Sequence, residues 1–233
     1  MIQGYLDWLK EHENAYTILN GDLMNCATKG STPELFDDKT TPDDAYKRLR
    51  TLLMPVKSKI LMVTRGGHEE HVYRTVGTDY MARLAYDLGD VPYRPDGGFL
   101  SVYVPRRQGD KQRIEFDFYA THGWGGARTI GAKLKKVEEL AIAVEADVYI
   151  LSHDHTQAVH RFNQLGASKK HDKQGIRRLI PHRKLLVNTG GFLMYDGYVA
   201  RKGYSPQDLG TPRIRCEVKH NNDEYYKDLH SSI

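Results

Sequence analysis

Four apolar runs of this chain, each with the length and composition of a buried β-strand, are followed closely by a histidine or an aspartate. The runs and the residues behind them are Ala15–Asn20 with Asp22, Lys59–Thr64 with His68, Gln112–Ala120 with His122, and Val148–Leu151 with His153 and His155. Binding sites in α/β sheets collect at the carboxyl ends of the strands. The repetition therefore predicts a sheet that gathers five ligand-type side chains at one edge.

Helices alternate with these strands in the first half of the chain. They are predicted to begin at residue 2, to run from Thr41 to about Met54, to run from Asp79 to about Leu88, and to span residues 127–144. Thr41 is a hydroxyl N-cap followed by a proline, and Gly89 is suited to a C-cap. These signals favour helices packed on a sheet.

The second half of the chain is mainly strands. Phe99–Val104 and Gln112–Ala120 flank a basic turn and indicate a hairpin. Further strands are predicted at residues 158–162, 184–188 and 213–218, with a polar loop over 164–177 and a turn at Gly190–Leu193 into a last pairing segment. Residues 219–233 are predicted to be a polar, frayed C-terminal tail.

Together these elements predict a layered α/β fold in a single domain over residues 1–218. A chain of 233 residues can bury one sizeable core and is too short for two large domains. Its composition, 39% hydrophobic and 27% charged, is that of a globular protein and argues against disorder.

Three features predict a cytoplasmic protein with no membrane partner. The chain has no apolar run of transmembrane length, its first residues lack the basic region of a signal peptide, and its two cysteines, Cys26 and Cys216, form no disulfide framework. The formal charge of +4 is compatible with a phosphate-bearing partner such as nucleic acid or a nucleotide, but many other enzymes share it.

The side chains at the strand ends suit a transition metal. His153 and His155 lie on the same side of an extended backbone, and imidazoles suit zinc, iron, manganese or nickel better than calcium. Asp22 could bridge two cations. Each motif also has a simpler explanation, since an aspartate often caps a turn and a His-x-His pair often arises by chance.

His122 and His68 add to the same constellation. His122 belongs to a glycine-dense turn, residues 121–126, whose backbone can approach a ligand closely. His68 could protonate a leaving group beside a metal pair, but without a site nearby it is only a histidine at a helix start. The basic runs at Arg106–Arg107, Lys169–Lys170 and Arg177–Arg178 are interpreted as solvated loops, with contact to a polyanion as the less favoured alternative.

Taken in order, Gly21–Asp22, Gly66–Glu69, His122–Gly123 and His153–His155 resemble the motif blocks of the calcineurin-like metallophosphoesterases, above all the small phage and prophage versions. The stretch Asn188–Phe192, with Tyr195 and Tyr198 behind it, resembles the C-terminal strands of that family. The resemblance covers residues 1–218.

The resemblance implies a β-sandwich flanked by helices and a pair of divalent metals. Asp22 would bridge the two ions, His122 and His153 would bind one, and His155 would bind the other. His68 would be the acid or the transition-state stabiliser. A metal-bridging hydroxide would attack the phosphorus in line. Asp22 is then expected within roughly a dozen ångströms of His153 and His155, since ions cannot be shared over a longer distance.

The chain departs from the family pattern at two places. The family opens with a strand that ends in Asp-x-His. That strand has no counterpart here, which indicates a late-assigned start codon or a truncated or degenerate form. Gly67 stands where the family has an asparagine ligand, and Asn25, Glu69 or water could take its place. We therefore expect metal to bind more weakly than at a complete site.

Two main functions follow. The first is a metal-dependent phosphoester hydrolase, more specifically a phosphodiesterase acting on nucleic acid or nucleotides. The second is a catalytically impaired remnant of such an enzyme that binds a phosphate-bearing ligand or a partner protein. A purely structural role would leave the strand-end histidines unexplained.

Overall fold

Five strands form the main sheet of the computed structural model, which describes residues 2–27, 40–195, 206–221 and 224–233. Their order across the sheet is β3 (Gly98–Pro105), β4 (Arg113–Thr121), β5 (Val148–Leu151), β7 (Arg177–Thr189) and β6 (Gln157–His171). The three central strands are parallel, and β3 and β6 pair antiparallel at the two edges. The chain is thus an α/β protein with a mixed sheet.

The central strands are buried on both faces, and their side chains alternate between two cores. All four residues of β5 are buried. Val148 and Ile150 face one core together with Phe116 of β4, while Tyr149 and Leu151 face the helix α6 (Ile130–Ala143). This burial explains why β5 is a continuous apolar run without polar alternation.

Two smaller sheets cover the face of the main sheet that lies opposite α6. Strand β1 (Thr17–Asn20) pairs in parallel with β2 (Ile60–Thr64), and β8 (Arg213–Asn221) pairs antiparallel with β9 (Glu224–Ser232). Met62 of β2 and Leu229 of β9 are buried in the same core as Phe116. The molecule therefore has two layers of β-structure.

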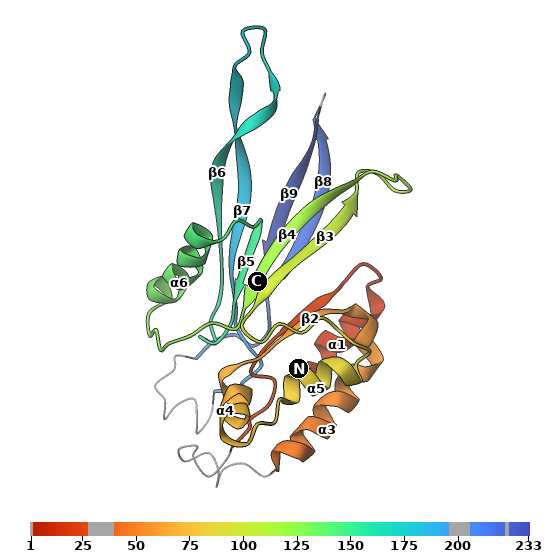
Figure 1. Ribbon diagram of the computed structural model, residues 1–233, viewed down its shortest axis with the longest axis vertical. Helices are drawn as coiled ribbons and strands as arrows, with labels where there is room; N and C mark the ends of the chain where they lie inside the picture. The colour runs from red at the N-terminus through yellow and green to blue at the C-terminus, as the bar shows by residue number, and fades with distance from the viewer. Residues whose placement is uncertain (1, 28–39, 196–205, 222–223) are drawn as a thin grey trace.

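The remaining helices pack on the outer side of β1 and β2 (Figure 1). They are α1 (Ile2–Glu11), α3 (Pro42–Leu53), the 3-10 helix η1 (Met54–Lys59), α4 (Gly67–Val76) and α5 (Tyr80–Asp87). The predicted N-cap of α3 is confirmed, because Thr41 accepts a hydrogen bond from the amide of Asp44. Asp79, at the predicted start of α5, accepts from the amides of Met81 and Ala82. Helix α4 begins at Gly67, so His68 does lie at a helix start.

The predictions for the second half of the chain need four corrections. Residues 219–233 are not a frayed tail, because β9 pairs with β8 along its length and Leu229 is fully buried. The predicted boundary at residue 218 falls inside β8. The predicted loop over 164–177 belongs mostly to a long β6–β7 hairpin. Residues 190–195 form no strand, and Tyr198 and most of the predicted loop at 22–40 lie outside the described residues.

The sequence pattern did not reveal strand β9 for a physical reason. The inward positions of β9 include Lys227 as well as Leu229, since the Lys227 ammonium pairs with buried Asp147. A half-buried lysine at an inward position disguises the apolar alternation on which strand prediction relies. No helix among the described residues is both long enough and apolar enough to span a membrane.

Candidate metal centre

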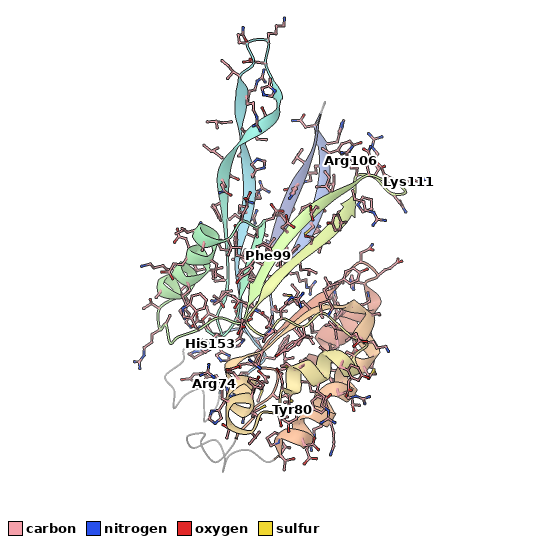
Figure 2. The ribbon with its side chains drawn as sticks, viewed as in Figure 1. Arg74, Tyr80, Phe99, Arg106, Lys111 and His153 are labelled. Atoms are coloured by element: carbon pink, nitrogen blue, oxygen red, sulfur yellow. The ribbon has the colours of Figure 1, made fainter. Side chains whose placement is uncertain are left out.

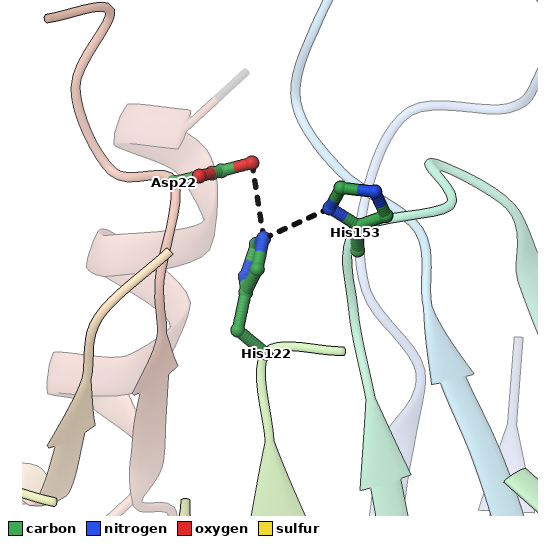
Figure 3. Close-up of side chains that lie close together, drawn as sticks. All are labelled: Asp22, His122 and His153. Atoms are coloured by element: carbon green, nitrogen blue, oxygen red, sulfur yellow. Dashed lines mark hydrogen bonds and ion pairs between the residues drawn. The ribbon is translucent and has the colours of Figure 1, made fainter. Parts of the chain in front are cut away.

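Asp22, His122 and His153 meet at the carboxyl ends of β1, β4 and β5 (Figure 3). One potential ligand atom from each lies within 4.8 Å of the others. Asp22 comes from the small β1–β2 sheet, whereas both histidines follow strands of the main sheet. The predicted convergence of these three side chains is confirmed, and the site lies where the two β-layers meet.

The orientation of His122 is fixed by its backbone neighbour. Its Nδ1 lies 2.7 Å from the carbonyl oxygen of Asn20, so this nitrogen carries the proton and donates it. Its Nε2 then faces Asp22 Oδ2 at 3.1 Å. The ring is only 5% exposed, so it has little freedom to turn away.

His153 is held in the same manner by a different carbonyl. Its Nε2 lies 2.6 Å from the carbonyl oxygen of Gly125, which makes Nε2 the donor. Its Nδ1 faces His122 Nε2 at a distance of 3.3 Å. Each ring thus donates its N–H to a backbone carbonyl. The second nitrogen of each ring faces the other ring and Asp22.

This donor set fits a divalent transition metal. With both outer N–H groups engaged, two ring nitrogens and a carboxylate oxygen converge as electron-pair donors, and they need a cation between them. A proton on His122 Nε2 supplies one, and a metal ion supplies a stronger one. Imidazole and carboxylate ligands suit zinc, iron, manganese or nickel, and a carbonyl behind each ligating ring is the usual outer shell of such sites.

The electrostatics of the three groups agree with metal binding. Burial of the Asp22 carboxyl opposes its ionisation, but the hydrogen bond and charge of His122 outweigh burial and hold its pKa well below the usual range. Burial opposes protonation of His122, yet the Asp22 carboxylate raises the pKa of this imidazole. Burial and the neighbouring His122 charge lower the pKa of His153. His153 is therefore neutral at neutral pH, the form that ligates metals.

Backbone strain is concentrated at the candidate ligands. Asp22, His153 and His155 have φ values of 51°, 65° and 51°, and Asp90 is the only other non-glycine with positive φ among the described residues. Such conformations cost on the order of 1–3 kcal/mol each and cluster at functional sites. The strain is offset by the hydrogen bonds that hold these loops.

Two glycines let the ends of β1 and β2 approach each other. A Cβ on Gly21 would lie 2.7 Å from His122 Nδ1, and a Cβ on Gly66 would collide with the backbone nitrogen and carboxylate of Asp22. No side chain fits at either position, so both glycines are required by packing at the site.

Asn20 is a central residue that the sequence reasoning missed. Its amide nitrogen donates to Thr121 O and to Ser152 Oγ, both at 2.8 Å, and its amide oxygen accepts from Thr64 Oγ1. The side chain is buried and links the ends of β1, β2, β4 and β5 beneath the ligands. An asparagine closing an apolar run is a weak signal, so nothing in the sequence distinguished it.

Glu69 holds the Asp22 loop through its side-chain carboxylate. Its buried carboxylate accepts hydrogen bonds from the amides of Gly66, Asp22, Leu23 and Met24 at 2.7–3.1 Å. These bonds fix the turn that presents the Asp22 side chain. With its oxygens engaged by the backbone, Glu69 has no free lone pairs to offer a cation.

His68 and His155 lie beside the three-residue cluster. The backbone amide of His68 donates to Asp22 Oδ1 at 3.0 Å, and the His68 side chain is half-buried at the start of α4. His155 is half-buried next to Gly191, and burial lowers the pKa of its imidazole against the opposing effect of the Asp22 charge. The structure thus brings all five predicted residues to one edge. Potential ligand atoms of three of them, Asp22, His122 and His153, lie within 4.8 Å of one another.

A second acidic cluster, Glu217, Asp228 and His230, has ligand-type spacing but does not fit a metal ion. The Asp228 carboxylate is already paired with Arg183 at 2.7 Å, with Lys219 and with His230. These cations satisfy its charge, so a divalent ion would have to displace them.

Comparison with known proteins gives no assignment. No protein-family model matches the chain, and no curated protein matches it significantly. The function must therefore be inferred from the site.

Proposed function

We propose that this chain is a metal-dependent phosphoester hydrolase that acts on phosphodiesters. The observation that carries the proposal is the convergence of Asp22 Oδ2, His122 Nε2 and His153 Nδ1, with the second nitrogen of each ring tied to a backbone carbonyl. Three donors preset in this way lose little freedom on binding a cation.

The metal would be held by Asp22, His122 and His153, with Asp22 and His155 as candidate ligands of a second ion. Divalent cations bound there would polarise a phosphoester and lower the pKa of water. The low pKa of Asp22 keeps its carboxylate charged at neutral pH, and the carbonyls of Asn20 and Gly125 keep both imidazoles in the ligating tautomer.

The order of the motifs and the layered architecture support the same assignment. Two β-layers with helices on both outer sides agree with the sandwich that the calcineurin-like metallophosphoesterase resemblance implies. Nucleic acid or a nucleotide is the preferred substrate class, because the resemblance is to phage proteins and the chain is mildly basic.

In this proposal His68 protonates the leaving group. Its backbone amide is hydrogen-bonded to Asp22 Oδ1, so its side chain starts at the rim of the metal centre. A proton donor matters most for a poor leaving group. His68→Asn should therefore slow hydrolysis of a dinucleotide far more than hydrolysis of bis-p-nitrophenyl phosphate. Equal losses on both substrates would remove this role from His68.

The proposal is tested by metal content and turnover together. The purified chain, loaded with manganese, should retain close to one ion or more and hydrolyse bis-p-nitrophenyl phosphate. Asp22→Asn and His153→Ala should each lower both quantities by at least about tenfold. His160→Ala, which removes an exposed imidazole from β6, is the matched control and should change neither.

The second candidate is the impaired remnant, which binds phosphate-bearing ligands without hydrolysing them. It is favoured by the engagement of Glu69 with four amides and by the missing side chain at Gly67, which leave the second ion few ligands. Well under one ion per chain and no turnover, with His153→Ala indistinguishable from the parent chain, would establish the remnant and rule out the enzyme.

A further inference from the structure

The β6–β7 hairpin, residues 157–189, is an arm that extends well beyond the rest of the molecule (Figure 1). Its base packs in the main sheet, where Leu185 and Val187 are buried. Farther out the arm is exposed, with every residue of 171–179 at the surface. A two-stranded ribbon with both faces in water gains little from burial, so its length calls for a function other than packing.

The positive charge of the chain is concentrated on the arm. The arm carries eight Lys and Arg against a single acid, Asp172, whereas the whole chain has 34 against 30. The rest of the chain therefore has 26 basic residues against 29 acids. The net charge is thus positive on the arm and negative on the rest of the chain, which we call the body. Such a separation is the pattern of a polyanion-binding element.

Several cations of the arm have no acidic partner among the described residues. Among the described residues, Arg161, Lys173 and Arg178 form no ion pair. Arg177 bonds only to the backbone carbonyls of Ala167 and Ser168, which leaves its charge uncompensated. The carboxylate of Asp172 is occupied by amides of its own turn.

A second basic tip projects from the same end of the molecule. Figure 2 shows Arg106 and Lys111 at the tip of the β3–β4 hairpin, with His153 at the opposite end of the sheet. Residues 106–113 contain four basic residues and one acid. Two basic hairpins thus extend away from the end of the sheet that carries His153, with β8 and β9 between them (Figure 1).

We propose that the arm binds double-stranded DNA by inserting its β-ribbon into the major groove. The major groove of B-form DNA, about 12 Å wide, admits a two-stranded ribbon. The corresponding groove of A-form RNA is too narrow. Single strands are held by aromatic stacking, and Phe162 is the sole Phe, Tyr or Trp of the arm and is half-buried in the core beside α6. Exposed Leu165 and Leu179 are suited to contact thymine methyl groups.

The role of the arm as a substrate-holding element rests on the proposed hydrolase, but DNA binding itself does not. Strand β6 begins two residues after His155, but the exposed part of the arm lies at the end of the sheet away from the metal centre (Figure 2). Binding is therefore measured with EDTA present, where no hydrolysis can occur. Turnover is measured separately on bis-p-nitrophenyl phosphate, which is too small to reach the arm.

The experiment measures fluorescence anisotropy of a labelled duplex of about 20 base pairs, titrated with the full chain between about 50 and 200 mM salt. The test variant is Arg161→Gln/Lys173→Gln/Arg178→Gln. The control, Arg48→Gln/Lys57→Gln/Lys135→Gln, removes the same charge from exposed positions on the body. The test variant should bind at least about tenfold more weakly, with the salt slope reduced by about 2.7, while the control stays within about threefold of the parent chain.

Three results would overturn the proposal. They are no binding of duplex DNA by the parent chain, equal weakening by the two triple variants, and tighter binding of single-stranded DNA or duplex RNA than of duplex DNA. Self-association that Leu165→Ser/Leu179→Ser abolishes, with DNA binding insensitive to the arm charges, would assign the arm to a second copy of the chain. The arm variant should hydrolyse bis-p-nitrophenyl phosphate as fast as the parent chain. Failure of the DNA-binding proposal would then not count against the proposed hydrolase.

Discussion

At the scale of single residues, the site depends on groups that touch no ligand. Asn20, Glu69, Gly21 and Gly66 hold the ends of β1 and β2 against the main sheet, and each acts through hydrogen bonds or through the absence of a Cβ. Only after these contacts are satisfied can Asp22 reach His122. The candidate ligands can be recognised in the sequence by their side-chain chemistry. The residues that position them cannot.

Asn20→Ala should destabilise the fold and the site together. The change removes a buried partner from Thr64 Oγ1, Thr121 O and Ser152 Oγ, although Ser152 Oγ keeps Thr189 Oγ1. Each group left unsatisfied costs about 1–3 kcal/mol. We expect a loss of about 2–4 kcal/mol in urea unfolding, with weaker metal binding. Asn163→Ala on the exposed arm is the control. An unchanged unfolding midpoint would show that the Asn20 network contributes nothing.

The Asp22–His122 pair predicts a pH window of stability for the metal-free chain. The pKa of Asp22 is lowered on folding, so its contribution is complete above about pH 3.9 and is lost as the pH falls through the folded pKa. The pKa of His122 is raised, so its contribution is complete below about pH 6.5 and is lost as the pH rises through the folded pKa. In EDTA, the stability difference between the parent chain and Asp22→Asn should be largest between these limits. A difference that grows above this window would contradict the pairing.

At the scale of elements, α6 clamps the loop that carries His153 and His155. The buried Lys133 ammonium donates to Asp154 O at 2.8 Å, and Lys136 binds the Asp154 carboxylate at 2.9 Å and Trp124 O at 2.6 Å. The two lysines lie one helical turn apart, on the face that packs on the sheet. One helix thus holds both histidine-bearing loops of the main sheet.

Lys136→Met should weaken metal binding without changing any ligand. It frees the 153–155 loop from α6 and leaves Asp154 unpaired in a buried position. Loss of such an outer contact typically costs 10–100-fold in metal affinity, so we expect about that reduction in a manganese titration. Lys135→Met, at the exposed neighbouring position, should bind like the parent chain. Equal affinities for the two variants would rule out the clamp.

Leu229→Ala tests whether β9 belongs to the core. Leu229 is fully buried beneath Phe116 and Leu185, and truncating such a side chain costs about 2–5 kcal/mol. Chemical denaturation should show a loss in this range, whereas Ile233→Ala, at a position 72% exposed, should stay within about 0.5 kcal/mol of the parent chain. A comparably small effect for Leu229→Ala would restore the reading of this segment as a frayed tail.

At the scale of the whole molecule, the candidate site joins two separate sheets. Asp22 belongs to the β1–β2 layer, and His122 and His153 belong to the main sheet, so one cation would connect both layers. The arm extends from the same main sheet and carries a net positive charge, whereas the net charge of the body is negative. The candidate metal site and the net positive charge of the arm thus lie at opposite ends of one sheet.

Manganese should therefore stabilise the entire fold. A ligand that binds only the folded state at about 100 times its Kd adds about 2.7 kcal/mol. Thermal unfolding should shift upward in manganese and return in EDTA, and Asp22→Asn should abolish the shift. A shift that persists in Asp22→Asn would place the metal elsewhere, and no shift in the parent chain would argue against a structural link between the layers.

The sequence by itself determined the strands that precede each candidate ligand, the caps of α3 and α5, and the five candidate residues that lie at one edge. These features depend on local patterns: apolar runs, side-chain hydroxyls and carboxylates at helix starts, and histidines at strand ends. The site edge could be foreseen because parallel strands present their carboxyl ends together.

Only the tertiary structure decided which of these residues meet and what holds them. The 3.1 Å approach of Asp22 to His122 joins groups that are 100 positions apart in the chain, and it depends on Asn20, Glu69 and two glycines whose importance is invisible locally. The strand β9 and the arm were hidden because their strands carry polar side chains, which find partners or solvent only in three dimensions. Local patterns report the covalent neighbourhood of a residue, whereas burial and pairing are properties of the folded molecule.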